Sequence, residues 1–196
     1  MAIGPTIETD RLILRPPRAE DFDSWVAFHA DEEVMTHLGG VQGPELTWRS
    51  MCAMTGAWTI AGCSMFSVIE KASGQWVGRL GPWHPHGWPG TEVGWGLARA
   101  AWGKGYATEG AAACMDYAVD ILGWDEIIHT ILPVNAGSIA WPNALAAVYC
   151  ARRRHRHRLR ARCGTFTARP PTSGVHAGSK VREVGLNRLA GGTFCG

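Results

Sequence analysis

The chain has 196 residues, 46% of them apolar and 18% charged, which fits one globular domain and excludes a disordered or low-complexity protein. No apolar run approaches the roughly twenty residues of a membrane-spanning helix, and there is no basic-then-apolar leader, so no membrane partner and a cytoplasmic location are expected. The six cysteines lie far apart, without metal-ligand spacing, so no metal site is expected and the cysteines are interpreted as buried or incidental thiols.

The net charge of +2 conceals a division of the chain. Residues 1–126 contain 8 Lys/Arg and 16 Asp/Glu, whereas residues 127–196 contain 11 and 1. The basic part includes an arginine-rich run at 152–158, which could bind phosphate backbones by releasing counterions. Because it lacks interleaved aromatic residues and any recognisable nucleic-acid fold, nucleic-acid binding is not favoured.

The spacing of apolar residues divides the acidic part into alternating strands and helices. The predicted strands are 11–15, 63–70, 75–80, 91–97 and 126–134. The predicted helices are 19–30, 44–58 and 107–122, and the Pro, Gly and Trp-rich stretch 81–90 is predicted to be a loop or bulged hairpin. This alternation predicts an α/β fold, a mixed sheet with helices on both faces. Beyond residue 140 the periodicity fails, so we expect a domain at 1–140 and an atypical basic segment at 141–196.

A glycine-bearing turn joins the strand at 91–97 to the helix at 107–122. Gly103 and Gly105 flank Lys104 just before that helix. The first turn of a helix presents amides without intrahelical partners and a positive dipole end, so this turn is suited to a phosphate group. Pairs of glycines also make ordinary turns, so this signal alone is weak.

Four motifs in a fixed order resemble the GNAT (Gcn5-related) N-acetyltransferases, especially the branch of ribosomal-protein N-terminal acetylases. They lie at 9–15, 92–95, 102–109 and 135–139, within a resemblance that covers residues 6–140. It implies a GNAT-like acyl-CoA N-acyltransferase fold with a mostly antiparallel sheet, whose last strands are missing or replaced in this chain. One departure is Ala100, where the family has Gln or Arg; Arg99 is adjacent.

The resemblance implies acetyl-CoA as cosubstrate and an amine as acceptor. In the family the strand before the loop splays from its neighbour and its backbone pairs with the pantetheine arm, as an added strand would. The implied acetyl-CoA contacts are Val93, Trp95, Leu97, Trp102, Gly103, Lys104, Gly105, Tyr106, Ala107, Thr108 and Asn135. Gly94 and Gly96 are consistent with a local bulge in that strand, the alternative being a fully paired central strand. Asn135 could also be a simple helix cap.

Two residues are assigned to catalysis by the same resemblance. Glu92 occupies the position of a glutamate that removes a proton from the amine through water; the alternative is a solvated carboxylate at a strand end. Ser138 is the candidate that steadies the sulfur or donates a proton, because the tyrosine many members use would fall near Pro142 and is absent. Tyr149 lies in the atypical segment and is not assigned this role.

Two aromatic groups have open interpretations. The loop with Trp83, His84, His86 and Trp88 could form a rim for the acceptor, or simply pack with solvated imidazoles. Two histidines are too few for a convincing metal site. The stripe of Met51, Met54 and Trp58 is interpreted as core.

The break near residue 141 has a testable explanation in the genetic code. Back-translating 141–147 as TGG CCG AAC GCC TTG GCA GCC and reading from the third base gives Ala-Glu-Arg-Leu-Gly-Ser, which continues the family's helix. Other codons fit the same residues, so this result shows compatibility only. The hypothesis is a frameshift near Trp141, natural or a sequencing error.

The sequence therefore leaves three functional hypotheses. The first is an N-acetyltransferase that moves an acetyl group from acetyl-CoA to a protein N-terminus or small amine by direct attack. The second is a CoA-binding, catalytically impaired protein with a defective C-terminus, and the third is a basic-tailed nucleic-acid binder. A sheet without its last strands also exposes an edge, so a homodimer or aggregate is expected rather than a monomer.

Overall fold

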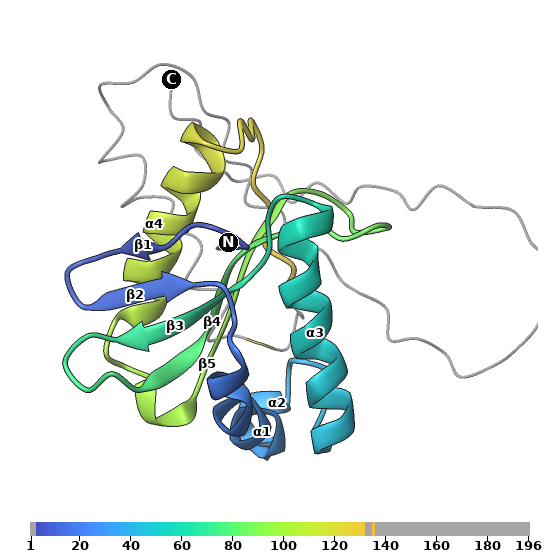
Figure 1. Ribbon diagram of the computed structural model, residues 1–196, viewed down its shortest axis with the longest axis vertical. Helices are drawn as coiled ribbons and strands as arrows, with labels where there is room; N and C mark the ends of the chain where they lie inside the picture. Colours follow the sequence, from blue (N-terminus) through green and yellow to red (C-terminus); the bar gives the residue numbers. More distant parts are fainter. Residues whose placement is uncertain (1–2, 132–134, 136–196) are drawn as a thin grey trace, which may run out of the picture.

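A computed structural model describes residues 3–131 and 135. Its five strands form one antiparallel sheet in sequential order, β1 to β5 (Figure 1). The strands are β1 (Ile7–Glu8), β2 (Leu12–Arg15), β3 (Phe66–Glu70), β4 (Trp76–Trp83) and β5 (Glu92–Leu97). The helices are α1 (Phe22–Ala30), α2 (Glu32–Met35), α3 (Pro44–Ile60) and α4 (Tyr106–Asp120), with 3-10 turns at Ala19–Asp21 and Arg99–Ala101.

Helices cover both faces of the sheet, as the sequence predicted (Figure 1). On one face, α4 packs against β2, β4 and β5 around a core that includes Leu12, Leu14 and Leu80. Gly110 allows this close approach, because a Cβ there would lie 3.2 Å from Leu80 Cδ1. On the other face, Phe28 of α1 meets Trp76 of β4 edge to face at 5.6 Å between ring centroids.

A buried ion pair fixes the start of α1 to the sheet. Arg15 donates two hydrogen bonds of 2.8 Å to Asp21, and Ser67 donates a third of 2.7 Å. Burial alone would raise the pKa of Asp21, but the bonds from Arg15, the Arg18 amide and Ser67 together lower it. Asp21 is therefore ionised at neutral pH and joins α1 to β2 and β3.

Several boundaries differ from the sequence prediction. β1 and α2 are additional elements, of two and four residues; Asp31 caps α2 by accepting hydrogen bonds from the amides of Glu33 and Val34. The stretch 81–90 was predicted to be a loop or bulged hairpin; β4 continues for three residues into it and pairs with β5 across it as a hairpin. Within the predicted strand 126–134 the described residues form one isolated parallel bridge, between Ile128 and Glu92.

The predicted bulge at Gly94 and Gly96 is wrong. The register between β4 and β5 is continuous, and the irregularity lies between Val68 and Ile69 of β3. The two glycines instead permit close packing, since a Cβ on Gly94 would lie 2.7 Å from Met65 Cε.

Within the described ranges, no helix is long and apolar enough to cross a membrane. Segment 141–196 lies outside these ranges, as do residues 136–140, so the division at residue 140 and the fate of the last strands stay predictions. The core interpretation of Met51 and Trp58 is confirmed, since both are buried.

Candidate active site

The glycine turn forms the N-terminal end of α4. Gly103 and Gly105 have φ angles of 73° and 79°, a left-handed conformation that favours glycine, and Gly105 is the N-cap residue. The first intrahelical bond runs from the Glu109 amide to the Gly105 carbonyl, 3.1 Å. A Cβ on Gly103 would meet nothing within 4 Å, so the turn is open on that side. Its geometry fits an anion bound at a helix N-terminus.

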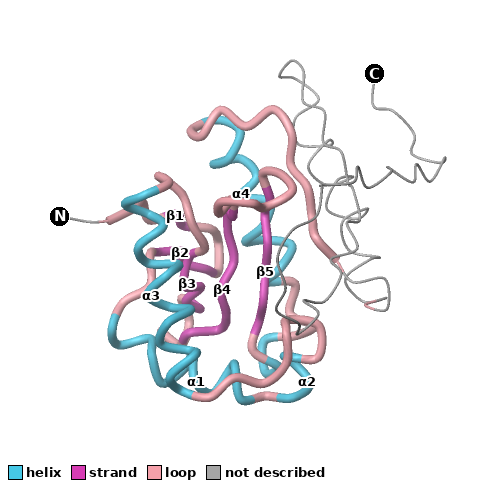
Figure 2. Tube along the Cα trace, turned by 90° about the vertical axis from the view of Figure 1, so that its right-hand side faces the viewer, coloured by secondary structure: helices cyan, strands magenta, loops and turns pink. Residues whose placement is uncertain are grey.

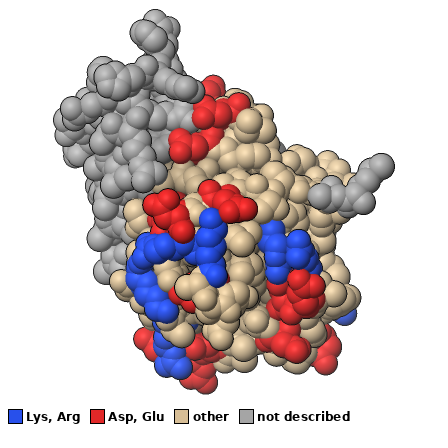
Figure 3. Space-filling model, turned by 60° about the vertical axis from the view of Figure 1, so that its left-hand side comes forward, with Lys and Arg blue, Asp and Glu red and all other residues tan. Residues whose placement is uncertain are grey.

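Charged side chains around this turn are held in pairs. The Arg11 guanidinium donates to Glu109 at 2.6 Å and to the Lys104 carbonyl at 2.9 Å. Lys104 Nζ lies 3.8 Å from Glu70, which also accepts the hydroxyl of Tyr106. Figure 3 shows such basic side chains next to acidic ones across the surface. The charges largely cancel, so an anion here would depend mainly on backbone amides and the helix dipole.

The predicted contacts on either side of the turn differ in exposure. Tyr106 is 7% exposed and belongs to the core, so only its backbone is suited to a ligand. Trp102 is 44% exposed and donates its indole N–H to the Leu97 carbonyl at 2.9 Å. Ala107 and Thr108 lie in the first turn of α4. Arg99, next to the departure at Ala100, forms ion pairs with Asp31 and with Glu33 of α2.

The outer edge of β5 parts from the next segment after a single bridge (Figure 2). Ile128 donates its amide to the Thr91 carbonyl at 2.8 Å and accepts the Val93 amide at 3.4 Å. A longer parallel ladder would next join the Thr130 amide to the Val93 carbonyl. Instead, the Thr130 amide donates to the Glu92 carboxylate at 2.9 Å. The Val93 carbonyl is hydrogen-bonded to His129 Nδ1 at 2.8 Å.

The side chains of Glu92 and His129 thus end the backbone pairing between β5 and the next segment, where the resemblance expects the strands to splay. Val93 already uses both backbone groups within the protein, which argues against it as a cosubstrate contact. Because alternate residues of a strand direct their backbone groups to the same edge, those of Trp95 and Leu97 also face outward from β4. The strand is therefore not paired along its whole outer edge by the described residues.

Glu92 is 6% exposed, so the alternative of a solvated strand-end carboxylate is wrong. Its Oε1 accepts the Thr130 amide; its Oε2 accepts the Thr130 hydroxyl at 3.1 Å and the Trp88 indole at 2.5 Å. Burial raises the pKa of Glu92, while these bonds and the positive charge of Arg79 oppose that rise. A carboxylate with a raised pKa is a better proton acceptor toward an ammonium group.

The sequence did not predict the donors to Glu92. Trp88 was considered only as part of an acceptor rim, and Thr130 carries no sequence signal because it follows Glu92 by 38 residues. His84 and His86 are both exposed and outside any strand. Among residues 3–131 and 135, no three His, Cys, Asp or Glu side chains gather as a metal site would require.

The remaining site predictions lie at the limit of the described chain. Asn135 is partly buried, and Ser138 lies outside the described residues. Their expected roles therefore stay predictions.

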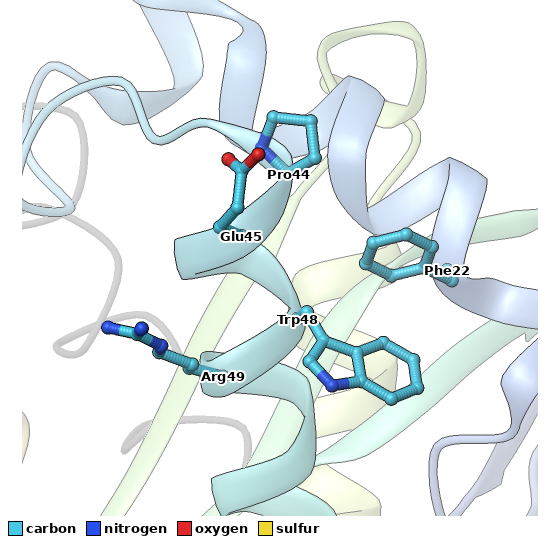
Figure 4. Close-up of a pocket in the computed structure, with 5 residues that line it drawn as sticks. All are labelled: Phe22, Pro44, Glu45, Trp48 and Arg49. Carbon is cyan, nitrogen blue, oxygen red and sulfur yellow. The ribbon is translucent and has the colours of Figure 1, made fainter.

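One surface hollow of the described part of the chain lies away from these residues. About 450 Å³ in volume, it is formed by α1 and α3, where the Phe22 ring meets the Trp48 ring edge to face at 5.2 Å (Figure 4). Glu45 and Arg49 flank it, and it includes none of the predicted site residues. Nothing in its composition indicates a role in acyl transfer.

Comparison with known proteins supports one assignment. The Acetyltransferase (GNAT) domain family matches residues 11–145, so the match ends close to the change in composition. The uncharacterized N-acetyltransferase p20 of Bacillus licheniformis is 30% identical over 144 residues, 72% of this chain and 81% of that protein. The acetyltransferase from Agrobacterium tumefaciens strain C58 is also 30% identical, with a TM-score of 0.67 over 72% of this chain and 82% of that one.

A ribosomal-protein-S5-alanine acetyltransferase from Vibrio fischeri shares the fold, with a TM-score of 0.60 and 16% identity over 72% of this chain and 81% of that one. The turn at the start of α4, the parting of β5 from the next segment and the buried Glu92 are consistent with these matches. The chain belongs to the GNAT acetyltransferases, a family that uses acetyl-CoA.

Proposed function

We propose that this protein transfers an acetyl group from acetyl-CoA to a primary amine by direct attack, without a covalent enzyme intermediate. One observation supports the proposal: a single strand, β5, joins a buried carboxylate at its start to a glycine turn beyond its end, at the N-terminal end of α4. Six residues of strand span about 17 Å. That arrangement suits an extended thioester whose phosphates lie at the turn and whose acyl group lies toward Glu92.

The residues around the turn fit the phosphates of acetyl-CoA. Gly103 leaves the turn open, and the amides from Gly103 to Ala107 lie at the positive end of α4. Toward the end of β5, the outward amide of Leu97 would donate to the pantetheine arm as an added strand would require, while the Leu97 carbonyl accepts the Trp102 indole. When bound there, acetyl-CoA supplies the acetyl group as a thioester.

Glu92 would accept a proton from the ammonium form of the acceptor, through a water molecule. Attack by the neutral nitrogen then forms the C–N bond while the C–S bond breaks, and the thiolate takes a proton as it leaves. A strand amide facing the thioester would stabilise the developing negative charge on its oxygen. Ser138 remains the proposed donor to the thiolate.

The acceptor is proposed to be either a protein N-terminus or a small amine. The similarity to a ribosomal-protein acetyltransferase supports the first at the level of the fold only. The half-buried Trp88 next to Glu92 and the exposed His84 and His86 support an acceptor rim at residues 83–90.

The hydrogen bonds of Glu92 also support a second candidate function. Both oxygens of Glu92 are already hydrogen-bonded, as they would be if the residue only joined β5 to Thr130. The protein would then bind CoA but transfer acetyl groups poorly.

One experiment separates the two functions. Acetyl-CoA is titrated into the full chain by calorimetry, and thiol release is then followed with peptide N-termini and small amines. The proposed enzyme requires Glu92→Gln to reduce turnover at least about a hundredfold with little change in affinity for acetyl-CoA. Glu126→Gln, an exposed acid near the same junction, is the matched control. Binding without turnover of any amine would favour the second function, and no binding would contradict both.

A further inference from the structure

Arg79 is a partly buried cation, and among the residues that the structure describes no acidic side chain is bonded to it. It lies in the middle of β4, opposite Gly96 of β5. Its Nη1 contacts the Met65 sulfur at 2.9 Å, and its guanidinium carbon lies 5.8 Å from the centre of the Phe28 ring. Its buried Nε has no hydrogen-bond partner. Burying a charged donor without a partner costs stability, so this arrangement needs an explanation.

Arg79 and Glu92 lie on the same face of the sheet. Glu92, Gly94 and Gly96 alternate on β5, so their side positions point to one face, and a Cβ on Gly96 would lie 2.8 Å from Phe28. Arg79 also reaches Phe28, which places it on that face. Between them lies Met65, whose sulfur contacts Arg79 and whose methyl group covers Gly94, next to the Glu92 carboxylate.

Charge and access agree with this geometry. Burial lowers the pKa of Arg79 to about 10, so the side chain stays cationic at neutral pH, and the charge of Glu92 supports that state. Arg79 also disfavours a second positive charge on the buried His29. The residue as a whole is partly exposed but its Nε is buried, so a ligand would reach Nε after Met65, a flexible side chain, moves aside.

We propose that Arg79 binds a carboxylate on the amine acceptor while the acceptor's amine lies at Glu92, so that this enzyme prefers acceptors that carry both groups. A guanidinium matches a carboxylate with paired hydrogen bonds, and the unpartnered Nε is one of the donors such a pair uses. Free amino acids and peptides with an acidic residue near the N-terminus share this chemistry. The inference rests on the proposed amine acetylation at Glu92.

The test compares matched acceptors with and without the carboxylate. Alanine is paired with alaninamide, and an amidated Ala-Glu peptide with its Ala-Gln counterpart, at saturating acetyl-CoA. The wild type should prefer the acid of one pair. The pair that shows the preference tells whether the acceptor is a free amino acid or a peptide with an acidic residue near its N-terminus. Arg79→Met should reduce that preference in kcat/KM by at least about tenfold, mainly through the KM of the acid, whereas any effect of the lost charge on the pKa of Glu92 should change acid and neutral amine alike. Arg79→Lys should restore part of the preference, and Arg49→Met, which removes an exposed cation of α3, should change nothing.

The thermal midpoint of Arg79→Met distinguishes a ligand-binding arginine from one that is needed only for stability. Replacing a buried, unpartnered cation with an apolar side chain should keep or raise the thermal midpoint, whereas loss of a structural arginine should lower it. The proposal is overturned if the wild type shows no preference for either acid, or if Arg79→Met slows acids and amides equally. If no amine is acetylated, the proposed function fails. The role of Arg79 is then decided by comparing the affinities of alanine and alaninamide for the wild type and for Arg79→Met.

Discussion

The bond from Trp88 to Glu92 gives a quantitative prediction about pH. Trp88→Phe keeps an aromatic ring in the loop and removes the indole N–H that lies 2.5 Å from Oε2. That N–H favours the ionised carboxylate, so its loss should raise the pKa of Glu92 further. The wild-type rate should already fall at a higher pH than an ordinary glutamate would give, because burial raises this pKa.

The expected size of the pKa shift depends on how many hydrogen bonds to Glu92 remain in Trp88→Phe. A hydrogen bond to a charged group contributes about 1.5 to 3 kcal/mol, and 1.36 kcal/mol corresponds to one pKa unit. Two bonds from Thr130 persist in the variant, so we take the lower figure. The acidic limb of kcat/KM should move upward by about one pH unit.

The assay is thiol release from acetyl-CoA across a pH series, with one amine used for both proteins. Because the amine is the same, its own ionisation cancels in the comparison. Trp83→Phe is the control, since Trp83 pairs in register with Glu92 but donates no bond to its carboxylate. An unchanged acidic limb in Trp88→Phe, at an unchanged plateau rate, would refute the role of Glu92 as the base.

Three further predictions concern stability and the gene. Gly96→Ala should lower the free energy of unfolding by about 1 to 3 kcal/mol in urea, because the added Cβ would lie 2.8 Å from the rigid, buried ring of Phe28; an unchanged midpoint would contradict the packing. Asp21→Asn should cost about 3 kcal/mol at pH 7 by leaving the buried Arg15 with only the exposed Glu20, 3.6 Å away, as an acidic partner. Since the folded pKa of Asp21 is lowered, its contribution to wild-type stability is present above the unfolded pKa and lost as pH falls through the folded one; a variant with the same acid dependence would contradict this. Resequencing the gene around codon 141 tests the frameshift, and an intact frame with homogeneous reads would contradict a sequencing error.

The parts of the fold that sequence reasoning predicted depend on local signals. The glycines before α4 and the apolar stripe through Ala111 and Met115 lie within one short window, and both predictions are confirmed. α2 has only four residues and β1 only two, too few to show a period. The packing of Gly94 against Met65 depends on a contact between distant segments, so the sequence indicated a bulge instead.

The sequence predicted which residues form the candidate site, but not their burial or their hydrogen-bond partners. The motif identified Glu92, yet its burial depends on Thr130 and on a tryptophan in a loop without periodic structure. Arg79 carried no motif, because its significance lies in the absence of an acidic partner, which only packing reveals. Arg11 lay in the opening motif, but its bond to the Lys104 carbonyl depends on how β2 meets the turn.

The position of Glu92 combines two functions that one substitution can separate. Its Oε1 takes the Thr130 amide that a longer ladder would give to Val93, so the carboxylate that we propose as the base also keeps the strands apart. Glu92→Gln retains an acceptor oxygen for the Thr130 amide, but it loses the proton acceptor and the oxygen that accepts the Trp88 indole N–H. Glu92→Ala loses the acceptor for the Thr130 amide as well. We therefore expect Gln to reduce kcat with acetyl-CoA affinity kept, and Ala to weaken acetyl-CoA binding as well, by about tenfold. Equal acetyl-CoA affinities in the two variants would show that the strands part without help from this carboxylate.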